Sequence, residues 1–279
     1  MHSGNLRATL GAMTGSLRSL ARRLLGVARH PTYYLPWIIR PGLECALVLS
    51  NVEARFKPEY ASGPFRASVV QYDAQGAAAH VYAVSLQTST DAVELPLKPA
   101  AGGWGFVTVT GDFTQSDLYV TLSDGRDYTA THGRGEFVEE YPPVTRLLLA
   151  AARGAASLVG RTVPVFTRNQ YVFVGLDSRA HVLLMNLSNV TNSIRAVLGA
   201  DGRVAGSRLL RLPPMGSHLL DVTTLVDVAT LVDVASLAGR PSDSAALRLR
   251  LEGNAWFNLY LVGAGPLDLA GPLSLMHVK

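Results

Sequence analysis

The sequence predicts a mainly β protein of two tandem antiparallel β-sandwich domains, immunoglobulin-like in general pattern, each preceded by an α-helix. The first observation is a repeat, because Leu-Ser-Asn-Val at 49–52 recurs at 187–190, about half of the 279-residue chain further on. The second is that apolar segments of about five to eight residues alternate with turn-forming residues through both halves. The third is that a helix-forming segment and then a proline-containing apolar segment precede each copy. The chain is therefore expected to consist of two related halves.

The composition favours a well-packed globular protein. Hydrophobic residues make up 48% of the chain and charged residues 16%, and 279 residues are enough to build two cores. The single cysteine, Cys45, excludes an intrachain disulfide and a zinc site with several cysteines, and its apolar neighbours predict a buried, inert thiol. Because neither a secretory signal nor a long uncharged apolar segment is found, a cytoplasmic location is expected; an acid-free leader containing arginine and serine is the alternative.

Residues 5–29 are expected to form an amphipathic helix within a basic extension that spans residues 1–30. Apolar side chains recur there at steps of three and four residues, which places them on one face of the helix. This helix either packs on its own domain or a sister subunit, or it attaches to an anionic membrane surface. In the second case the docking residues are Arg18, Arg22 and Arg23.

The first β domain is expected at residues 31–141. Pro31 ends the preceding helix, and the aromatic segment 33–39, interrupted by Pro36, predicts an edge strand because proline removes a ladder hydrogen bond. Turns containing aspartate and glycine are expected at residues 73–76 and 123–126. The other strands of this domain are expected at residues 46–52, 65–72, 81–86, 106–110 and 118–122.

A linking helix is expected at residues 142–162, because Pro142 and Pro143 precede a segment rich in helix formers. The second β domain follows at residues 163–279. Its strands are expected at residues 171–174, 181–187, 194–198, 208–212, 218–222, 247–251 and 256–262.

Two segments depart from the repeat. Residues 53–64 lengthen the first half and are interpreted as an inserted loop. In the second half, Thr-Leu-Val-Asp-Val-Ala at 224–229 is repeated at 230–235. Two copies are too few for a β-helix, so a local duplication forming a helical or loop excursion is expected.

The densest polar segment, residues 124–136, is the main candidate for a site. It contains His132 together with Arg126, Arg134 and Glu136, and its glycines would let a ligand approach the backbone. Such a loop would bind an anion or a sugar, with His132 as the catalytic acid or base. The alternative is a polar hairpin and linker between the halves, without a chemical role.

Tyr33 and Tyr34 are the aromatic residues expected to be exposed, beside the proline-interrupted entry to the first domain. Exposed aromatic side chains stack on sugar rings or anchor protein partners. The histidines are isolated from one another and no cluster of carboxylates accompanies them, and no nucleotide-binding or nucleophile motif is recognised. Neither a metal ion nor a cofactor is therefore expected.

Positive charge is concentrated at the start of the chain. The net charge is +4, the first acid is Glu44, and the arginines before it are Arg7, Arg18, Arg22, Arg23, Arg29 and Arg40. The remainder is close to neutral, which argues against nucleic acid as a partner. A protein partner or self-association is expected, and a membrane surface is the further candidate.

Two function classes follow from these observations. A non-catalytic binding or structural protein, docking on a partner or membrane through its N-terminal basic helix, is favoured because no catalytic motif is recognised. The alternative is an enzyme or small-ligand-binding protein that uses a cleft between the halves near His132. A filled core and an exposed apolar patch would favour the first class, and a pocket around His132 with a perturbed titratable neighbour would favour the second.

Overall fold

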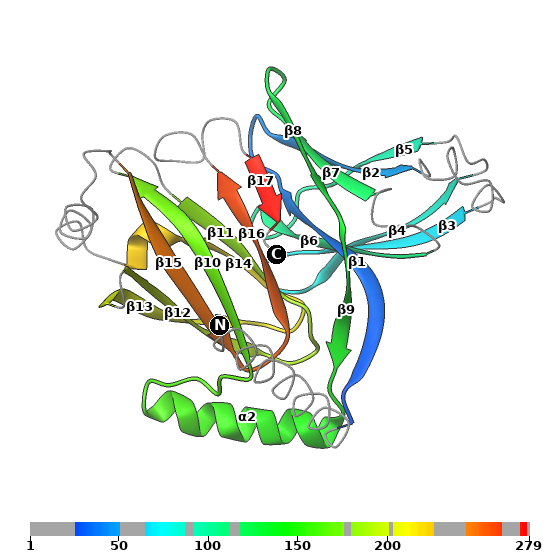
Figure 1. The fold of residues 1–279 in the computed structure, drawn as a ribbon. Coiled ribbons are helices and arrows are strands. Elements are labelled where there is room, and N and C mark those ends of the chain that lie inside the picture. Colours follow the sequence, from blue (N-terminus) through cyan, green and yellow to red (C-terminus); the bar gives the residue numbers. More distant parts are fainter. Residues whose placement is uncertain are drawn as a thin grey trace, which may run out of the picture.

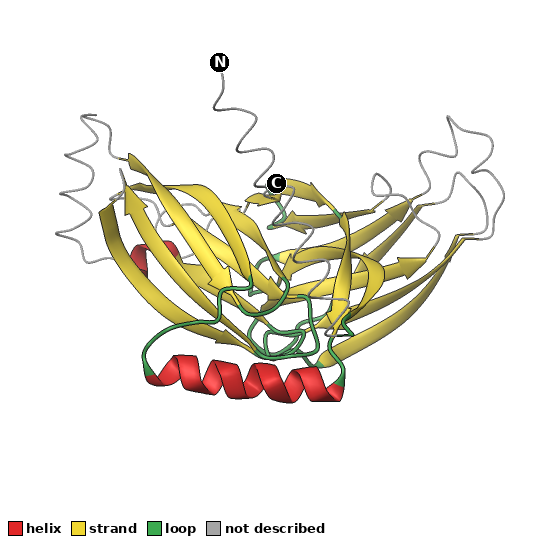
Figure 2. Ribbon diagram, turned by 60° about the horizontal axis from the view of Figure 1, so that its bottom comes forward, coloured by secondary structure: helices red, strands yellow, loops and turns green. Residues whose placement is uncertain are grey.

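The computed structural model describes residues 26–50, 65–86, 92–111, 118–175, 180–200, 203–225, 244–263 and 274–277 (Figure 1). In this part of the chain the protein is mainly β, as predicted, with four antiparallel sheets. The helices described are α2 (Pro143–Leu158) and the short 3₁₀ helix η4 (Val222–Leu225). Figure 2 shows α2 lying across the outside of the sheets rather than between them.

The first half contributes two sheets. Its described strands are β1 (Ala28–Ile38), β2 (Glu44–Ser50), β3 (Phe65–Tyr72), β4 (Ala78–Leu86), β5 (Ala92–Pro96), β6 (Trp104–Gly111), β7 (Leu118–Ser123), β8 (Tyr128–His132) and β9 (Arg134–Glu140). Sheet I has the order β4-β3-β6-β1-β9, and sheet II has the order β5-β2-β7-β8.

The second half contributes two further sheets. Its described strands are β10 (Phe166–Gly175), β11 (Ala180–Asn186), β12 (Asn192–Ala200), β13 (Arg203–Leu212), β14 (Ser217–Asp221), β15 (Ser244–Gly253), β16 (Phe257–Gly263) and β17 (Ser274–His277). Sheet III has the order β10-β15-β12-β13, and sheet IV has the order β14-β11-β16-β17.

The two halves have the same strand order. When β1 is matched with β10, β2 with β11 and so on to β17, sheet I without β9 has the order of sheet III, and sheet II has the order of sheet IV. The chain also passes from one sheet to the other at corresponding steps in both halves. Strand β9 is the addition in the first half.

Two apolar cores share sheet IV. Sheets I and II enclose the first core and sheets III and IV the second, but strand β11 contributes to both. Its side chains Leu183 and Met185 belong to the first core, whereas Val182 and Leu184 belong to the second. Strands with one solvent-facing side alternate between buried and exposed residues, and β11 does not, because both of its faces are covered. The junction between the halves is therefore filled with apolar side chains.

The second copy of Leu-Ser-Asn-Val ties β9 to the second half. The N–H of Glu139 donates to the carbonyl oxygen of Leu187 (2.9 Å), and the N–H of Asn189 donates to the carbonyl oxygen of Glu139 (3.2 Å). The Asn189 side chain also holds the backbone of Tyr141, accepting from its N–H at 2.9 Å and donating to its carbonyl at 3.2 Å. In the first copy, residues 51–52 lie outside the described residues.

The turn after β3 forms a second contact between the halves. The Asp73 carboxylate accepts two backbone N–H groups of this turn, both at 2.9 Å, which confirms the turn predicted there. The N–H of Ser217 in the second half donates to the carbonyl of Ala74 (3.1 Å). Gly76 has a φ of +83°, and a Cβ at this position would lie 1.9 Å from the carbonyl oxygen of Pro214. Only glycine fits this turn without displacing the second half.

Strand β1 lies inside sheet I, so the prediction of an edge strand is wrong. It pairs with β6 from Tyr33 onwards and with β9 as far as Tyr34. Pro31 and Pro36 therefore lie in the parts of β1 that have a neighbour on one side only. Proline is tolerated where its nitrogen faces an open side of the ladder, which reconciles two prolines with a central strand.

The predicted first helix extends too far, because its last residues lie in a strand. Ala28 and Arg29 belong to β1, opposite Glu140 and Glu139 of β9, so residues 28–29 are extended. The rest of that prediction, up to residue 25, lies outside the described residues. Within the part of the chain that is described, a helix precedes the second half alone, and this is α2.

Most of the predicted strands are confirmed to within a few residues, and β3 coincides with the prediction. The helix predicted after Pro143 is confirmed as α2. The sequence interpretation lacks β5, β8, β9 and β17. The inserted loop at 53–64 lies outside the described residues. The six-residue repeat begins at residue 224, and its first two residues end η4. The rest of the repeat also lies outside the described residues.

Cys45 lies in the first core, and burial raises the pKa of its thiol to about 12. Because the thiolate is the reacting species, the native protein should react with Ellman's reagent at pH 8 at least about a hundredfold more slowly than a free thiol. In denaturant the reaction should be complete within minutes. Absorbance at 412 nm measures both rates, and rapid stoichiometric reaction in native buffer would contradict the buried position.

Candidate functional site

Four of the residues selected from the sequence lie together near the junction of the halves. Tyr33 and Tyr34 of β1 lie beside β9, where Tyr34 is paired with Arg134. Arg134 Nη2 lies 3.2 Å from Glu136 Oε1, and both side chains are largely buried. Tyr34 itself is fully buried, so the prediction that it is exposed is wrong; Tyr33 is partly buried.

The second half adds three side chains that the sequence interpretation lacks. The ring of Tyr260 lies edge-on to that of Tyr34 at 6.2 Å. The guanidinium of Arg168 lies over the ring of Trp256 at 4.8 Å. These residues are more than a hundred positions away from β1, and no local pattern in the sequence marks them as its neighbours.

Burial determines the protonation of this group. Desolvation raises the pKa of Tyr34, and the neighbouring Tyr260 raises it further. Desolvation likewise raises the pKa of Tyr260, so both phenols stay neutral at physiological pH. Desolvation lowers the pKa of Arg168, and Glu136 opposes that shift. The two neutral, buried phenols are suited to packing and hydrogen bonding between the halves.

Residues 124–136 do not form one binding loop, which corrects the sequence interpretation. They comprise a turn, strand β8 of sheet II and the start of β9 in sheet I. The chain crosses between the sheets at Gly133, whose N–H donates to the carbonyl of Leu118 (2.8 Å). A Cβ at this position would make tight contacts of 3.2 and 3.1 Å with the side chains of Leu35 and Leu118. Strand pairing on both sides of the crossing therefore replaces the predicted loop.

The side chains of His132 and Arg126 lie apart from the Tyr34–Arg134 group. His132 is opposite Tyr119 on the outer face of sheet II, with ring centroids 4.7 Å apart. It contributes only its backbone carbonyl to the group, accepting a hydrogen bond from the Tyr260 hydroxyl at 3.2 Å. Arg126 lies in the exposed β7–β8 turn, which Asp124 closes by accepting two backbone N–H groups at 2.7 and 2.9 Å; these bonds lower the pKa of Asp124.

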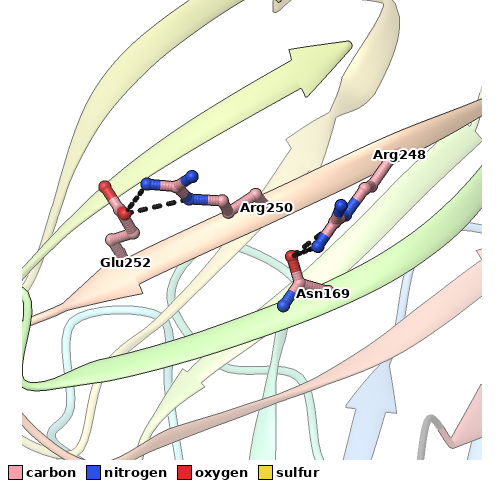
Figure 3. A network of polar contacts seen from close by, with 4 residues as sticks. All are labelled: Asn169, Arg248, Arg250 and Glu252. Atoms are coloured by element: carbon pink, nitrogen blue, oxygen red, sulfur yellow. Dashed lines mark hydrogen bonds and ion pairs between the residues drawn. The ribbon is translucent and has the colours of Figure 1, made fainter. Parts of the chain in front are cut away.

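The outer face of sheet III carries a set of arginines that we call the arginine face: Arg195, Arg211, Arg248 and Arg250. Residues directly opposite in an antiparallel sheet project to the same side, and the register places these four on one face. Figure 3 shows how the β15 pair is held: Arg248 Nη2 donates to Asn169 Oδ1 at 2.9 Å, and Arg250 Nε donates to Glu252 Oε1 at 2.9 Å. Each guanidinium keeps further N–H donors for an anion.

The positive charge extends well beyond this face. Glu252 is the one acidic residue in residues 142–175, 180–200, 203–212 and 244–253. The arginines in the same ranges are Arg146, Arg153, Arg161, Arg168, Arg195, Arg203, Arg208, Arg211, Arg248 and Arg250. A surface of this composition attracts anions over a distance of roughly one Debye length, about 8 Å at physiological salt.

Helix α2 adds an apolar surface next to this charge. Thr145 is its buried residue, and Leu149 packs with Tyr141 and Val190 at the junction. Large apolar side chains point into solvent elsewhere on the helix, with Leu147 72% and Leu158 88% exposed. Solvent-exposed apolar residues gathered on one element indicate an interaction surface.

The other predictions about sites have separate outcomes. Arg18, Arg22 and Arg23 lie outside the described residues. Among the described residues, no group of three or more histidine, cysteine, aspartate or glutamate side chains could hold a metal ion. Within the same part of the chain, no helix has the length and apolar character needed to cross a bilayer. The sequence matches no protein-family model and resembles no curated protein.

Proposed function

We propose that this is a non-catalytic binding or structural protein that docks on a membrane surface, with a protein partner as the second possibility. The observation that carries the proposal is the exposed apolar side of α2, which lies next to an almost acid-free, arginine-rich part of the second half. A surface that combines apolar side chains with arginines suits an anionic, partly apolar target.

The proposal includes an origin by duplication of one sandwich unit. It is supported by the shared strand order of the halves and by the position of the Leu-Ser-Asn-Val copies at the ends of β2 and β11. The immunoglobulin-like label stays a prediction. Among the described residues the first half has sheets of five and four strands and the second half has two sheets of four, whereas the constant-type immunoglobulin domain has sheets of four and three.

A small-ligand site between the halves receives less support. Its favourable observation is that the hydroxyl of Tyr34, Nη2 of Arg168 and Nε1 of Trp256 are buried without a hydrogen-bond partner in the described residues. Against it, apolar side chains of sheet IV fill the junction, and His132 points away from it. A binding or structural role therefore accounts for more of the molecule.

Deleting residues 1–25 tests the docking role proposed for the N-terminal segment. The deletion stops before Ala28 and Arg29, because these residues belong to β1. With the three docking arginines gone, the bound fraction on vesicles with anionic lipids should fall at least about tenfold. Co-sedimentation measures it, with far-UV circular dichroism to confirm that the sheets persist. Unchanged sedimentation, together with an unchanged mass by light scattering, would contradict this role.

A further inference from the structure

We infer that the arginine face of sheet III binds a single strand of nucleic acid, whose phosphates lie on the arginines. The inference goes beyond the proposed function, because membrane docking does not require a second partner on this surface. The charge balance of the whole chain argues against nucleic acid, but it does not show where strand pairing places the arginines. The argument for this partner comes from the arrangement of the charges on the sheet.

The four arginines form a single line across the sheet. Arg248 and Arg250 are two residues apart on β15, which separates them by about 7 Å. The pairing of β15 with β12 makes Arg195 the diagonal neighbour of Arg250. The pairing of β12 with β13 makes Arg211 the diagonal neighbour of Arg195 in the same direction. Diagonal neighbours lie roughly 7–8 Å apart, so the line crosses three strands and covers about 20 Å.

The guanidinium groups of this line are available to an anion. Three of the four arginines are exposed, and Arg195 is half-buried. Arg248 uses its Nε and Nη2 on one acceptor atom of Asn169, and Arg250 does the same with Glu252 (Figure 3). Each therefore uses two of its five N–H groups and keeps three. Because a guanidinium binds a phosphate through two parallel hydrogen bonds, groups held in this way are prepared for phosphates.

An exposed aromatic ring lies at one end of the line. Tyr171 of β10 is directly opposite Arg248, so its side chain projects from the same face of the sheet. It is 64% exposed. Bases of a single strand stack on such rings whatever their identity, whereas the bases of a duplex are stacked on one another. A line of arginines that ends at an aromatic ring therefore favours a single strand over a duplex or a bilayer.

Charge complementarity argues against a second copy of the chain as the occupant. Among the residues that the structure describes, the exposed acids come from four different elements: Glu44, Glu94, Asp124, Asp127 and Glu140. The described part of a second copy thus offers no line of acids to match the four arginines. A nucleic-acid strand supplies one negative charge per nucleotide along its whole length. It therefore has the regular charge that the line requires.

Replacing Arg211 and Arg248 by glutamine tests the inference. Fluorescence anisotropy of a labelled single-stranded DNA, on the order of ten nucleotides long, measures binding by the full chain. The logarithm of the association constant should fall with the logarithm of the salt concentration with a slope of about −3, the value for four phosphates on a single strand. Arg211→Gln/Arg248→Gln should weaken binding at least about tenfold and reduce the slope to about −1.5.

A matched control removes the same charge elsewhere. Arg66 and Lys98 are exposed in the first half, and Arg66→Gln/Lys98→Gln should leave the affinity within about twofold of the original chain. The stacking role has its own pair of variants. Tyr171→Ala should weaken binding at least about fivefold, whereas Tyr171→Phe keeps the ring and should bind within about twofold of the original chain. Far-UV circular dichroism should be unchanged for all four variants.

Three results would overturn the inference. If both glutamine pairs weaken binding equally, only the net charge matters and the line of arginines has no special role. If a duplex of the same sequence binds as tightly and Tyr171→Ala has no effect, the occupant is not a single strand. If the DNA does not bind, but anionic vesicles bind and Arg211→Gln/Arg248→Gln releases them, a bilayer covers the arginine face instead.

Discussion

Replacing Arg29 by alanine should lower the free energy of unfolding by about 3 kcal/mol, because a buried carboxylate would lose its ion pair with Arg29. Arg29 Nη2 lies 3.1 Å from Glu139 Oε1, and the Glu139 side chain is fully buried. The hydroxyl of Tyr141 donates to the other carboxylate oxygen at 2.6 Å but carries no charge. Arg29 also lies 3.7 Å above the ring of Phe137, and that contact would be lost too. Urea unfolding followed by tryptophan fluorescence measures the effect.

The neighbouring hydrogen-bonded pair on the same two strands provides the control. His30 and Glu140 form a contact of 2.8 Å, but both side chains are largely exposed. Glu140→Ala should therefore cost less than about 1 kcal/mol, the usual value of a surface pair. If Arg29→Ala and Glu140→Ala lower the free energy of unfolding equally, burial of Glu139 does not determine how much Arg29 contributes to stability.

Replacing Gly76 by alanine should cost about 3 kcal/mol or more. Part of the cost is the left-handed φ of +83°, which is worth about 1–2 kcal/mol for a residue with a Cβ. The rest is a collision, because the new Cβ would lie 1.9 Å from the carbonyl oxygen of Pro214 and the turn would have to leave the second half. Urea unfolding at equilibrium measures this variant in the same way.

Gly125 separates the two contributions. Its φ of +84° is nearly that of Gly76, but nothing lies within 4 Å of the position that its Cβ would take. Gly125→Ala should therefore show the backbone term alone, about 1–2 kcal/mol. If both variants lose the same stability, the contact between the β3–β4 turn and the second half contributes nothing.

The sequence predicts the elements whose patterns are local. Alternation and turn residues place most strands and the Asp73 turn, and Pro143 marks the start of α2. The sequence does not predict the central position of β1. Whether a proline breaks a ladder depends on which side of the strand has a neighbour, and that is a property of the sheet. The sequence prediction fails for β8 and β9 as well, since their polar residues resemble a loop until the strands they pair with are known.

The candidate surface shows the same limit. Along the chain, the arginines of the second half are spread between leucines, as in Leu-Arg-Leu-Arg-Leu at 247–251. Only the register of β12, β13 and β15 collects them on one side of sheet III. For α2, the sequence predicts a helix but does not say which side faces the protein. The contacts of Thr145 and Leu149 decide that, and they leave the leucine-rich side in solvent.

The double burial of sheet IV has a consequence for how the sequence can change. Strands β11 and β16 have no outward side on which polar or smaller residues could be exchanged at little cost, so nearly every substitution there affects a packed core. Adjacent residues of β11 face different cores, so a shift of this strand that suits one core also moves the side chains in the other. The two halves are therefore free to diverge in their outer sheets, but sheet IV obliges their cores to evolve together.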